Sequence, residues 1–224
     1  GYPMGGEALS TTEGVISRSE WATLGFNRAR EPGMRVQVDA AINFGNSGGP
    51  AFSNGEIAGL VFSGLDKSQS DNISYLVSTE EINRFLAEVE AGTLDGNTMD
   101  FSGWQTLENP ALRDKLGLDR ETTGVVITKP SSEVLKPWDV LIEVNGYEID
   151  NKGQITIEDD RKVALGCAFG RFDPLVDGPM VKAKVLRDGT AVDVDLPVET
   201  SRAGQLQHRV QSDYPYLVYG PIVF

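Results

Sequence analysis

A single serine stands in a glycine-rich turn at residues 43–52, which read NFGNSGGPAF. Gly45, Gly48 and Gly49 flank Ser47, and glycine adopts positive φ without steric cost, so tight turns are allowed here. A serine hydroxyl becomes a nucleophile when a base removes its proton and backbone amides stabilise the oxyanion that forms. We therefore predict that the N–H groups of Gly45 and Ser47 converge on one point as an anion site. The alternative is a plain solvent-exposed turn.

The same letters also fit the nucleophile elbow G-x-S-x-G, in which the serine lies between a strand and a helix. His208 lies downstream of Ser47, as the order serine, acid, histidine of that arrangement requires. An elbow leads directly into a helix, however, whereas Pro50 and the run AFSNGEIAGLVF (51–62) predict a turn and a strand. The local context therefore disfavours the elbow.

Short β-rich runs lie on both sides of the serine turn. Clusters of Gly, Asn, Pro and Ser separate four of them: GVISR (14–18), MRVQVDAAI (34–42), EIAGLVFSG (56–64) and NISYLV (72–77). Strands of this length and spacing are typical of an antiparallel barrel or sandwich.

A helix is predicted directly after these strands. Ser78 and Glu81 have the spacing of a capping box, and Gly92 is a natural stop for the helix. Between them, apolar residues at helical spacing form one face: Ile82, Phe85, Leu86 and Val89. Residues 1–92 are thus predicted to form one mainly β unit with a terminal helix.

A second unit is predicted beyond the polar, glycine-containing segment 93–100, which we interpret as a linker. Residues 101–200 predict an α+β fold with the following elements: a helix at 109–118, strands at 124–128 and 139–144 with a tight turn at Asn145-Gly146, a helix at 161–172, and a hairpin at 180–198 around Asp188-Gly189. The tail 201–224 is either a docking arm or the start of a further domain. We expect that both ends of the chain are truncated.

The composition excludes several classes of partner and cofactor. A formal net charge of -13 argues against nucleic acid and against anionic membranes, because both require clustered Lys and Arg. No apolar stretch approaches the roughly 20 residues that span a bilayer. With one cysteine, Cys167, and one histidine, His208, the chain has neither an internal disulfide nor a Cys-rich or multi-histidine metal site. No cofactor is expected, and Cys167 is predicted to be a buried small hydrophobe.

Several blocks of the sequence resemble the HtrA/Deg-type serine proteases, which have a chymotrypsin fold. The second barrel of that family is matched, in order and spacing, by GYPMGG (1–6), TTEGVISR (11–18), VQVDAAINFGNSGGPAF (36–52) and NISYLVSTEEI (72–82). The PDZ domain of the family resembles WQTLENPALRDKLGL (104–118) and LKPWDVLIEVNG (135–146), the first being closer to the Deg-like branch of plants and some bacteria. The fold implied is mainly β: a second chymotrypsin-like β-barrel followed by an α+β PDZ domain, with residues 201–224 as the possible start of a second PDZ-like domain.

The resemblance implies roles for the residues around the serine turn. Ser47 would be the acylated nucleophile, and the amides of Gly45, Asn46 and Ser47 would surround the oxyanion hole, with the Asn46 side chain pointing away. Ala41 and Ile42 would line the S1 pocket and favour a modest apolar P1 residue.

An extended polypeptide would add as a strand to the run LVFSG (60–64), at Phe62, Ser63 and Gly64. The segments 19–33 and 63–72 correspond to loops that switch the oxyanion turn in relatives, and we expect them to be mobile.

The peptide-binding loop of the PDZ domain would be formed by Phe101, Ser102, Gly103 and Trp104. PDZ domains hold the C-terminal carboxylate of a peptide with backbone N–H groups. Asp100 would repel such a carboxylate, so capture of a C-terminus and a purely structural or regulatory role both remain open.

The triad of this fold runs histidine, aspartate, serine along the chain. His208 follows Ser47 and is therefore interpreted as a tail residue, and Asp39 matches a structural aspartate of the family. The fragment is thus expected to lack the catalytic histidine and aspartate and to be inactive alone.

The resemblance implies that the parent protein is an ATP-independent endopeptidase, trimer-based, that degrades misfolded or damaged proteins. The compartment stays open: periplasm or cell envelope in a bacterium, an organelle such as the plastid in a plant. The alternative is a non-catalytic pseudoprotease and PDZ scaffold or chaperone.

Overall fold

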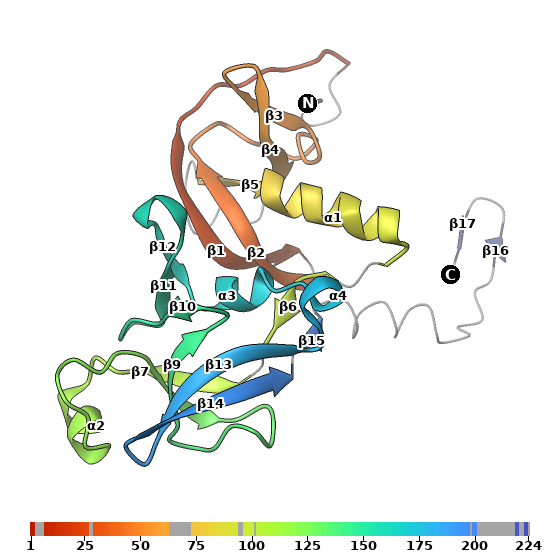
Figure 1. The fold of residues 1–224 in the computed structure, drawn as a ribbon. Helices are drawn as coiled ribbons and strands as arrows, with labels where there is room; N and C mark the ends of the chain where they lie inside the picture. The colour runs from red at the N-terminus through yellow and green to blue at the C-terminus, as the bar shows by residue number, and fades with distance from the viewer. Residues whose placement is uncertain are drawn as a thin grey trace.

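The computed structural model describes residues 1–2, 7–26, 29–62, 73–93, 96–100, 102–197, 199–200, 218–219 and 222–223. Two antiparallel sheets dominate it, and short helices lie between them and around them (Figure 1). Among these residues, no helix is both long and apolar enough to cross a bilayer.

The first sheet has the strand order β1-β2-β5-β4-β3. Its five strands are β1 (Ile16–Phe26), β2 (Ala29–Val38), β3 (Pro50–Ser53), β4 (Glu56–Phe62) and β5 (Ser74–Ser78). Val36, Val38, Ile42 and Leu76 form a small buried core on this sheet. The four predicted runs thus correspond to strands, with shifted boundaries.

The segment 19–33 was expected to be a mobile loop, and this expectation is wrong. Most of it belongs to the β1–β2 hairpin, whose ladder runs from Ile16 opposite Val38 to Phe26 opposite Ala29. Proline cannot donate a ladder hydrogen bond, so a strand that contains Pro32 needs an unpaired side at that residue. Here Pro32 pairs only with Thr23, since β5 joins β2 no earlier than Arg35, so one side of the strand is unpaired at the proline.

Helix α1 (Thr79–Ala91) begins and ends as the sequence predicts. The Ser78 side chain accepts a hydrogen bond from the Glu81 N–H, and Gly92 takes the left-handed conformation at φ 75°. Glu81 does not complete a capping box. Its carboxylate instead accepts a hydrogen bond from the Met34 N–H at 3.1 Å and lies 3.7 Å from the Arg35 guanidinium, which attaches the helix to β2.

The predicted apolar face of α1 is formed but not buried by the described residues. Phe85, Leu86 and Val89 are 43%, 52% and 50% exposed. The helical spacing therefore predicted the element correctly, while the expected packing of its face is not provided by the described part of the chain.

The second sheet has the order β14-β13-β9-β8-β7, and β10 pairs with β9. Its strands are β7 (Gly103–Thr106), β8 (Val125–Lys129), β9 (Val140–Val144), β10 (Tyr147–Glu148), β13 (Met180–Arg187) and β14 (Thr190–Pro197). Both predicted hairpin turns are confirmed, because Asn145-Gly146 and Asp188-Gly189 have positive φ at both residues. Helix α2 (Pro110–Lys115) is confirmed too, with Asn109 as its N-cap.

The helix predicted at 161–172 is only partly correct. This region contains β12 (Lys162–Ala164), which pairs with β11 (Gln154–Thr156), and then α3 (Gly166–Gly170). A 3-10 turn η2 (Glu158–Asp160) joins β11 to β12, and α4 (Pro174–Asp177) follows α3. The remaining short strands pair as β6 (Thr98–Met99) with β15 (Glu199–Thr200), and β16 (Val218–Tyr219) with β17 (Ile222–Val223).

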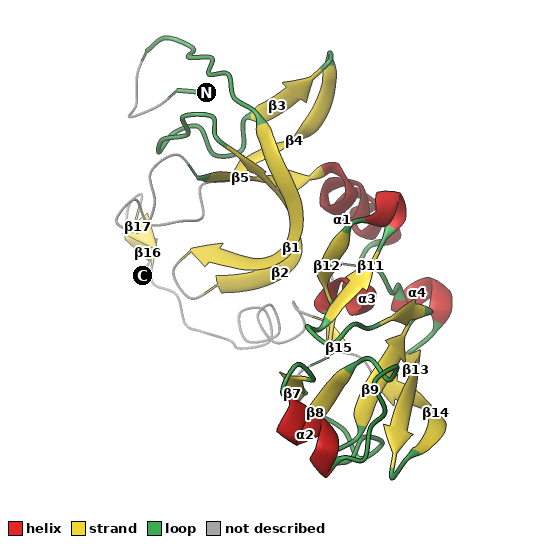
Figure 2. Cartoon of the chain, turned by 90° about the vertical axis from the view of Figure 1, so that its left-hand side faces the viewer, coloured by secondary structure: helices red, strands yellow, loops and turns green. Residues whose placement is uncertain are grey.

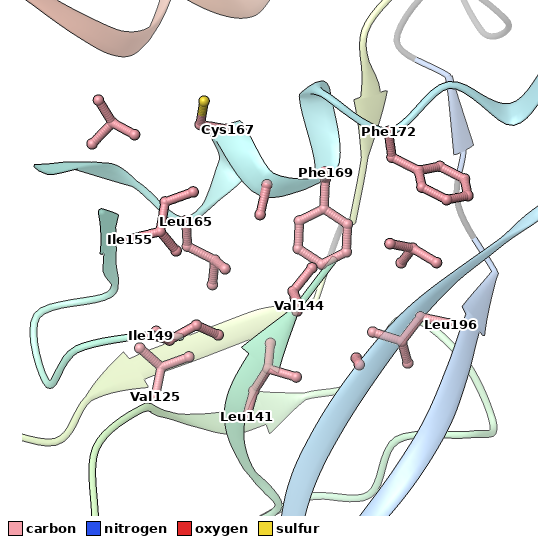
Figure 3. Close-up of a cluster of buried hydrophobic side chains, with 14 of the residues drawn as sticks. Val125, Leu141, Val144, Ile149, Ile155, Leu165, Cys167, Phe169, Phe172 and Leu196 are labelled. Atoms are coloured by element: carbon pink, nitrogen blue, oxygen red, sulfur yellow. The ribbon is translucent and has the colours of Figure 1, made fainter. Parts of the chain in front are cut away.

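The largest core lies between the second sheet and α3. Figure 3 shows Phe169 reaching from α3 toward Val144 of β9, with Cys167 on the same short helix. The core also includes Met34 of β2, and Trp21 of β1 packs against it. Side chains of the first sheet therefore help to close the core of the second unit.

The contact between Trp21 and α3 requires glycine at two positions. A Cβ built on Gly166 would lie 2.5 Å from Trp21 Nε1, and a Cβ on Gly170 would overlap the six-membered part of the indole ring. Both figures place α3 between the two sheets, where this contact occurs (Figures 1 and 2). Trp21 therefore fills the space that the missing side chains leave.

Ion pairs and hydrogen bonds surround this contact. Arg171 donates to Glu80 of α1 at 3.0 and 3.1 Å and to both carboxylate oxygens of Glu158 at 2.8 Å. Arg84 of α1 donates to the Asn97 carboxamide oxygen at 2.7 Å and also contacts the Gly170 carbonyl. The two units are thus joined by a network that the charges alone did not predict.

The connection at 96–100 is packed against both units. Asn97 is 5% exposed and donates to the Pro32 carbonyl at 2.6 Å, and Thr98 is fully buried and donates to the Phe172 carbonyl at 3.0 Å. The described part of the predicted linker is therefore packed against both units.

Gly170→Ala is expected to destabilise the protein by about 1–3 kcal/mol, because the added methyl group overpacks the Trp21 site. Urea unfolding would measure the loss. In the double variant with Trp21→Leu, the cost of the alanine should fall, since the overlapping ring is gone. An equal cost in both backgrounds would contradict the proposed contact.

Burial raises the pKa of the Cys167 thiol to about 12 from a reference value of 9.0. At about pH 8 the native protein should react with iodoacetamide on the order of a thousandfold more slowly than the urea-unfolded protein, because the thiolate is the nucleophile. The unfolded thiol loses its proton near its ordinary pKa and the folded thiol does not. Stability should therefore fall by about 1.4 kcal/mol per pH unit between these two values, a slope that Cys167→Ala removes.

Candidate active site

Ser47 lies on the loop that joins β2 to β3. Two consecutive β-turns shape this loop: the Asn46 N–H donates to the Asn43 carbonyl at 3.1 Å, and the Gly49 N–H donates to the Asn46 carbonyl at 3.0 Å. Gly45 and Gly48 occupy the third position of these turns with φ of 98° and 82°, a conformation that favours glycine. Ser47 itself is exposed at the second position of the second turn.

The loop is anchored to β4 just beyond the serine. The Gly48 N–H donates to the Val61 carbonyl, and the Val61 N–H donates to the Gly49 carbonyl, both at 2.8 Å. The two turn bonds and the bond to Val61 together engage the N–H groups of Asn46, Gly48 and Gly49. Within the described residues, no acceptor is bound to the N–H groups of Gly45 and Ser47, which are the two amides predicted to form an anion site.

Asn46 is buried, whereas its neighbours Gly45 and Ser47 are exposed. It is 8% exposed, and its side-chain oxygen Oδ1 is buried without a hydrogen-bond partner among the described residues. The side chain thus points inward, away from the exposed Ser47 side. Its place beside the oxyanion hole stays a prediction.

The two predicted S1 residues lie in different environments. Ala41 is exposed, whereas Ile42 is 8% exposed and packs in the core with Val36, Val38 and Leu76. Their assignment to a substrate pocket remains a prediction. For Ile42, the structure shows a packing role beneath the loop.

The predicted substrate edge is narrower than the run 60–64. Leu60 is paired on both sides, with Pro50 of β3 and Val77 of β5, and Val61 is held by the serine loop. Phe62 ends β4 and pairs with Tyr75 on one side. Ser63, Gly64 and the rest of 63–72 lie outside the described residues. A free edge for an added strand therefore begins no earlier than Phe62.

Tyr75, which pairs with Phe62, carries an uncharged phenol. Burial raises the pKa of Tyr75, and the Glu20 carboxylate that accepts its hydroxyl at 2.9 Å raises it further. Arg18 pairs with the same carboxylate at 3.1 Å. The phenol therefore remains a protonated hydrogen-bond donor and does not act as a base.

No histidine accompanies Ser47 in the described part of the chain. His208, the single histidine, lies outside it. Asp39 accepts a hydrogen bond from the Val15 N–H at 2.6 Å and donates its own N–H to the Val15 carbonyl. This pairing attaches the start of the loop to the segment before β1, as a structural aspartate does. In the described ranges, no group of three or more His, Cys, Asp or Glu residues is arranged to hold a metal ion.

Comparisons with known proteins bear on the family of the chain. The family described as Trypsin matches residues 15–86. Protease Do-like 2, chloroplastic, of Arabidopsis thaliana is 30% identical over 100% of this chain and 37% of its own length. Protease Do-like 4, mitochondrial, of the same plant is 31% identical over 100% of this chain and 43% of its own length.

Solved structures give the same result. The HtrA-type protease AlgW with decapeptide is 27% identical, with a TM-score of 0.60, over 89% of this chain and 58% of that one. The AlgW complex with tripeptide has 26% identity and a TM-score of 0.61 over 88% of this chain and 62% of that one. The chain therefore has a mainly β, chymotrypsin-like fold and is similar in sequence and structure to HtrA/Deg-like serine proteases. It spans less than half the length of the two plant relatives.

Gly48→Ala is expected to destabilise the loop by about 1 kcal/mol, because alanine resists the positive φ at this position. Gly48→Asn is the matched control, since asparagine tolerates the left-handed region. Urea unfolding should rank wild type, then Asn, then Ala. Equal losses for Asn and Ala would show that the backbone conformation does not set the cost, because open space surrounds the added Cβ.

Proposed function

We propose that the protein containing this chain is a serine endopeptidase in which Ser47 is the acylated nucleophile. One observation carries the proposal. Ser47 is exposed on a turn in which no described residue accepts from the Gly45 and Ser47 amides, while the amides of Asn46, Gly48 and Gly49 are bound. Unused N–H groups beside a nucleophile are suited to stabilise an oxyanion.

The reaction follows from these groups. Ser47 Oγ attacks the scissile carbonyl, its proton passes to a base, and the carbonyl oxygen becomes an anion beside the two amides. Collapse of this intermediate releases the amine and leaves an acyl-enzyme, which water hydrolyses. The base is assigned to a part of the longer protein outside this chain, because the chain spans 37% and 43% of two full-length relatives and no histidine lies near Ser47 in the described residues.

Extended, unfolded polypeptide is the proposed substrate. An added strand can pair with the end of β4 at Phe62 only if its own backbone groups are free, which excludes folded segments. Exposed Ala41 at the side of the loop is uncharged and small, which suits a modest apolar side chain. Misfolded or damaged proteins supply such segments.

A second candidate is a non-catalytic binding protein. Phe44, next to the serine turn, is 65% exposed, and the cross-strand pair Phe52 and Ile57 is 64% and 53% exposed. Apolar side chains exposed together are typical of surfaces that contact other proteins. A scaffold or chaperone would use this surface without chemistry at Ser47.

The full-length protein should react with a fluorophosphonate probe and cleave unfolded casein. Ser47→Ala should remove both activities, because the same serine oxygen attacks the phosphorus of the probe and the carbonyl of the substrate. Ser53→Ala, an exposed serine on β3, is the matched control and should leave both unchanged. Labelling of wild type no stronger than that of Ser47→Ala would reject the endopeptidase and favour the binding protein.

A further inference from the structure

The outer edge of β7 carries backbone groups that the sheet does not use. β7 is the last strand of the second sheet, at the side opposite β14 (Figure 2). Trp104 of β7 lies opposite Ile127 of β8. On the other side, toward β9, the Ile127 N–H donates to the Asp139 carbonyl and the Ile127 carbonyl accepts from the Trp138 N–H, both at 2.8 Å. Trp104 and Ile127 therefore form a non-hydrogen-bonded pair, and the Trp104 N–H and C=O point outward.

This edge is open to an added strand. Within the described residues, no partner is bound to the outward backbone groups of Trp104. Trp104 is 41% exposed, and its ring lies next to Gly153. An unpaired edge strand with its polar groups exposed is a template for an extended peptide. The pairs of this sheet are antiparallel, so an added antiparallel segment would place its C-terminal end beside the start of β7.

A carboxylate of the chain already occupies the start of β7. Asp100 Oδ1 accepts hydrogen bonds from the Ser102 N–H at 3.2 Å and from the Ser102 hydroxyl at 3.0 Å, and it contacts the Ser131 hydroxyl. The Ser131 N–H donates to Ser102 Oγ at 3.0 Å, which ties this loop to the end of β8. The Ser102 amide is one of those predicted to bind a peptide carboxylate, and it is bound internally.

We propose that Asp100 is a built-in carboxylate that makes the β7 edge select internal extended segments of polypeptides over free C-termini. A terminal carboxylate placed there would meet a like charge and an amide that already has an acceptor. An internal segment carries no charge at that point and needs only the outward groups of Trp104. The proposal concerns a site separate from Ser47, so neither stands or falls with the other.

Lys129 is the basic residue that bears on this proposal. It pairs with Gly103 at the start of β7 and is exposed. Its charge would attract a terminal carboxylate and oppose the effect of Asp100. Lys129→Ala therefore separates the two charges and should strengthen the preference for peptides without a free C-terminus.

The test uses the 224-residue chain carrying Ser47→Ala and four labelled decapeptides that end in Val, Leu, Ile or Phe. Each peptide is made with a free carboxylate and with an amidated end, and affinities are measured by fluorescence anisotropy. The wild-type loop should bind amidated peptides about threefold or more tightly than free acids. Asp100→Ala should reverse the preference, with a relative change of about tenfold or more, because it frees the Ser102 amide and removes the charge.

Two matched variants exclude a general loosening of the loop. Asp100→Asn keeps the acceptor but removes the charge, so it should bring the two forms of each peptide close to equal affinity. Ser131→Ala removes one bond to Asp100 and keeps the charge, so it should retain the wild-type preference. Tighter binding of free acids by wild type, the same change in Ser131→Ala as in Asp100→Ala, or no binding by any variant would each overturn the proposal.

Discussion

The packing of Trp21 against α3 is the interaction on which the arrangement of the whole chain depends. It requires two glycines on the helix and a long β1 strand that carries the indole out of the first sheet. Met34 enters the same core from β2, so two strands of one sheet contribute to the interior of the other unit. The pairing of Arg171 with Glu80 and Glu158 then surrounds an apolar contact with charge-assisted bonds that hold α1 in place. Burial of Trp21 supplies the non-directional part of this attachment. The directional bonds of the Arg171 guanidinium set how α1 is oriented.

Local chemistry explains what could be predicted from the sequence. The Ser78 cap, the Gly92 stop and the two glycine hairpin turns each depend on residues within a few positions, and each was found. The full β1–β2 hairpin was missed because its ladder joins residues up to 22 positions apart, and the segment 19–33 was assigned as a loop from the resemblance. The helix expected at 161–172 was too long because Val163 is required in a distant core, which favours a strand at that point. Failures thus occur where a long-range contact overrides a local preference.

The candidate site divides along the same line. The glycine pattern around Ser47 predicted the turns, because positive φ is a local property, whereas the convergence of the Gly45 and Ser47 amides stays a prediction. The burial of Ile42 and the pairing of Leu60 on both sides depend on β3 and β5, and neither was evident from the run of residues. The orphaned oxygen of Asn46 and the internal acceptor for the Ser102 amide are visible only in three dimensions. The side chain of Asp100 was noted in the sequence as a source of repulsion, but not as a bound ligand of its own loop.

The buried connection at Asn97 and Thr98 has a consequence for dissecting this protein. A cut before Asn97 would separate it from the Pro32 carbonyl, and a cut after Thr98 would separate that residue from the Phe172 carbonyl. Either cut would remove Met34 and Trp21 from the core that they complete. The separated second unit would present the Gly166 and Gly170 side of α3 to water, where Trp21 packs in the intact chain. Such a piece would be prone to self-association, so its behaviour in isolation would reflect the newly exposed surface as much as the native unit.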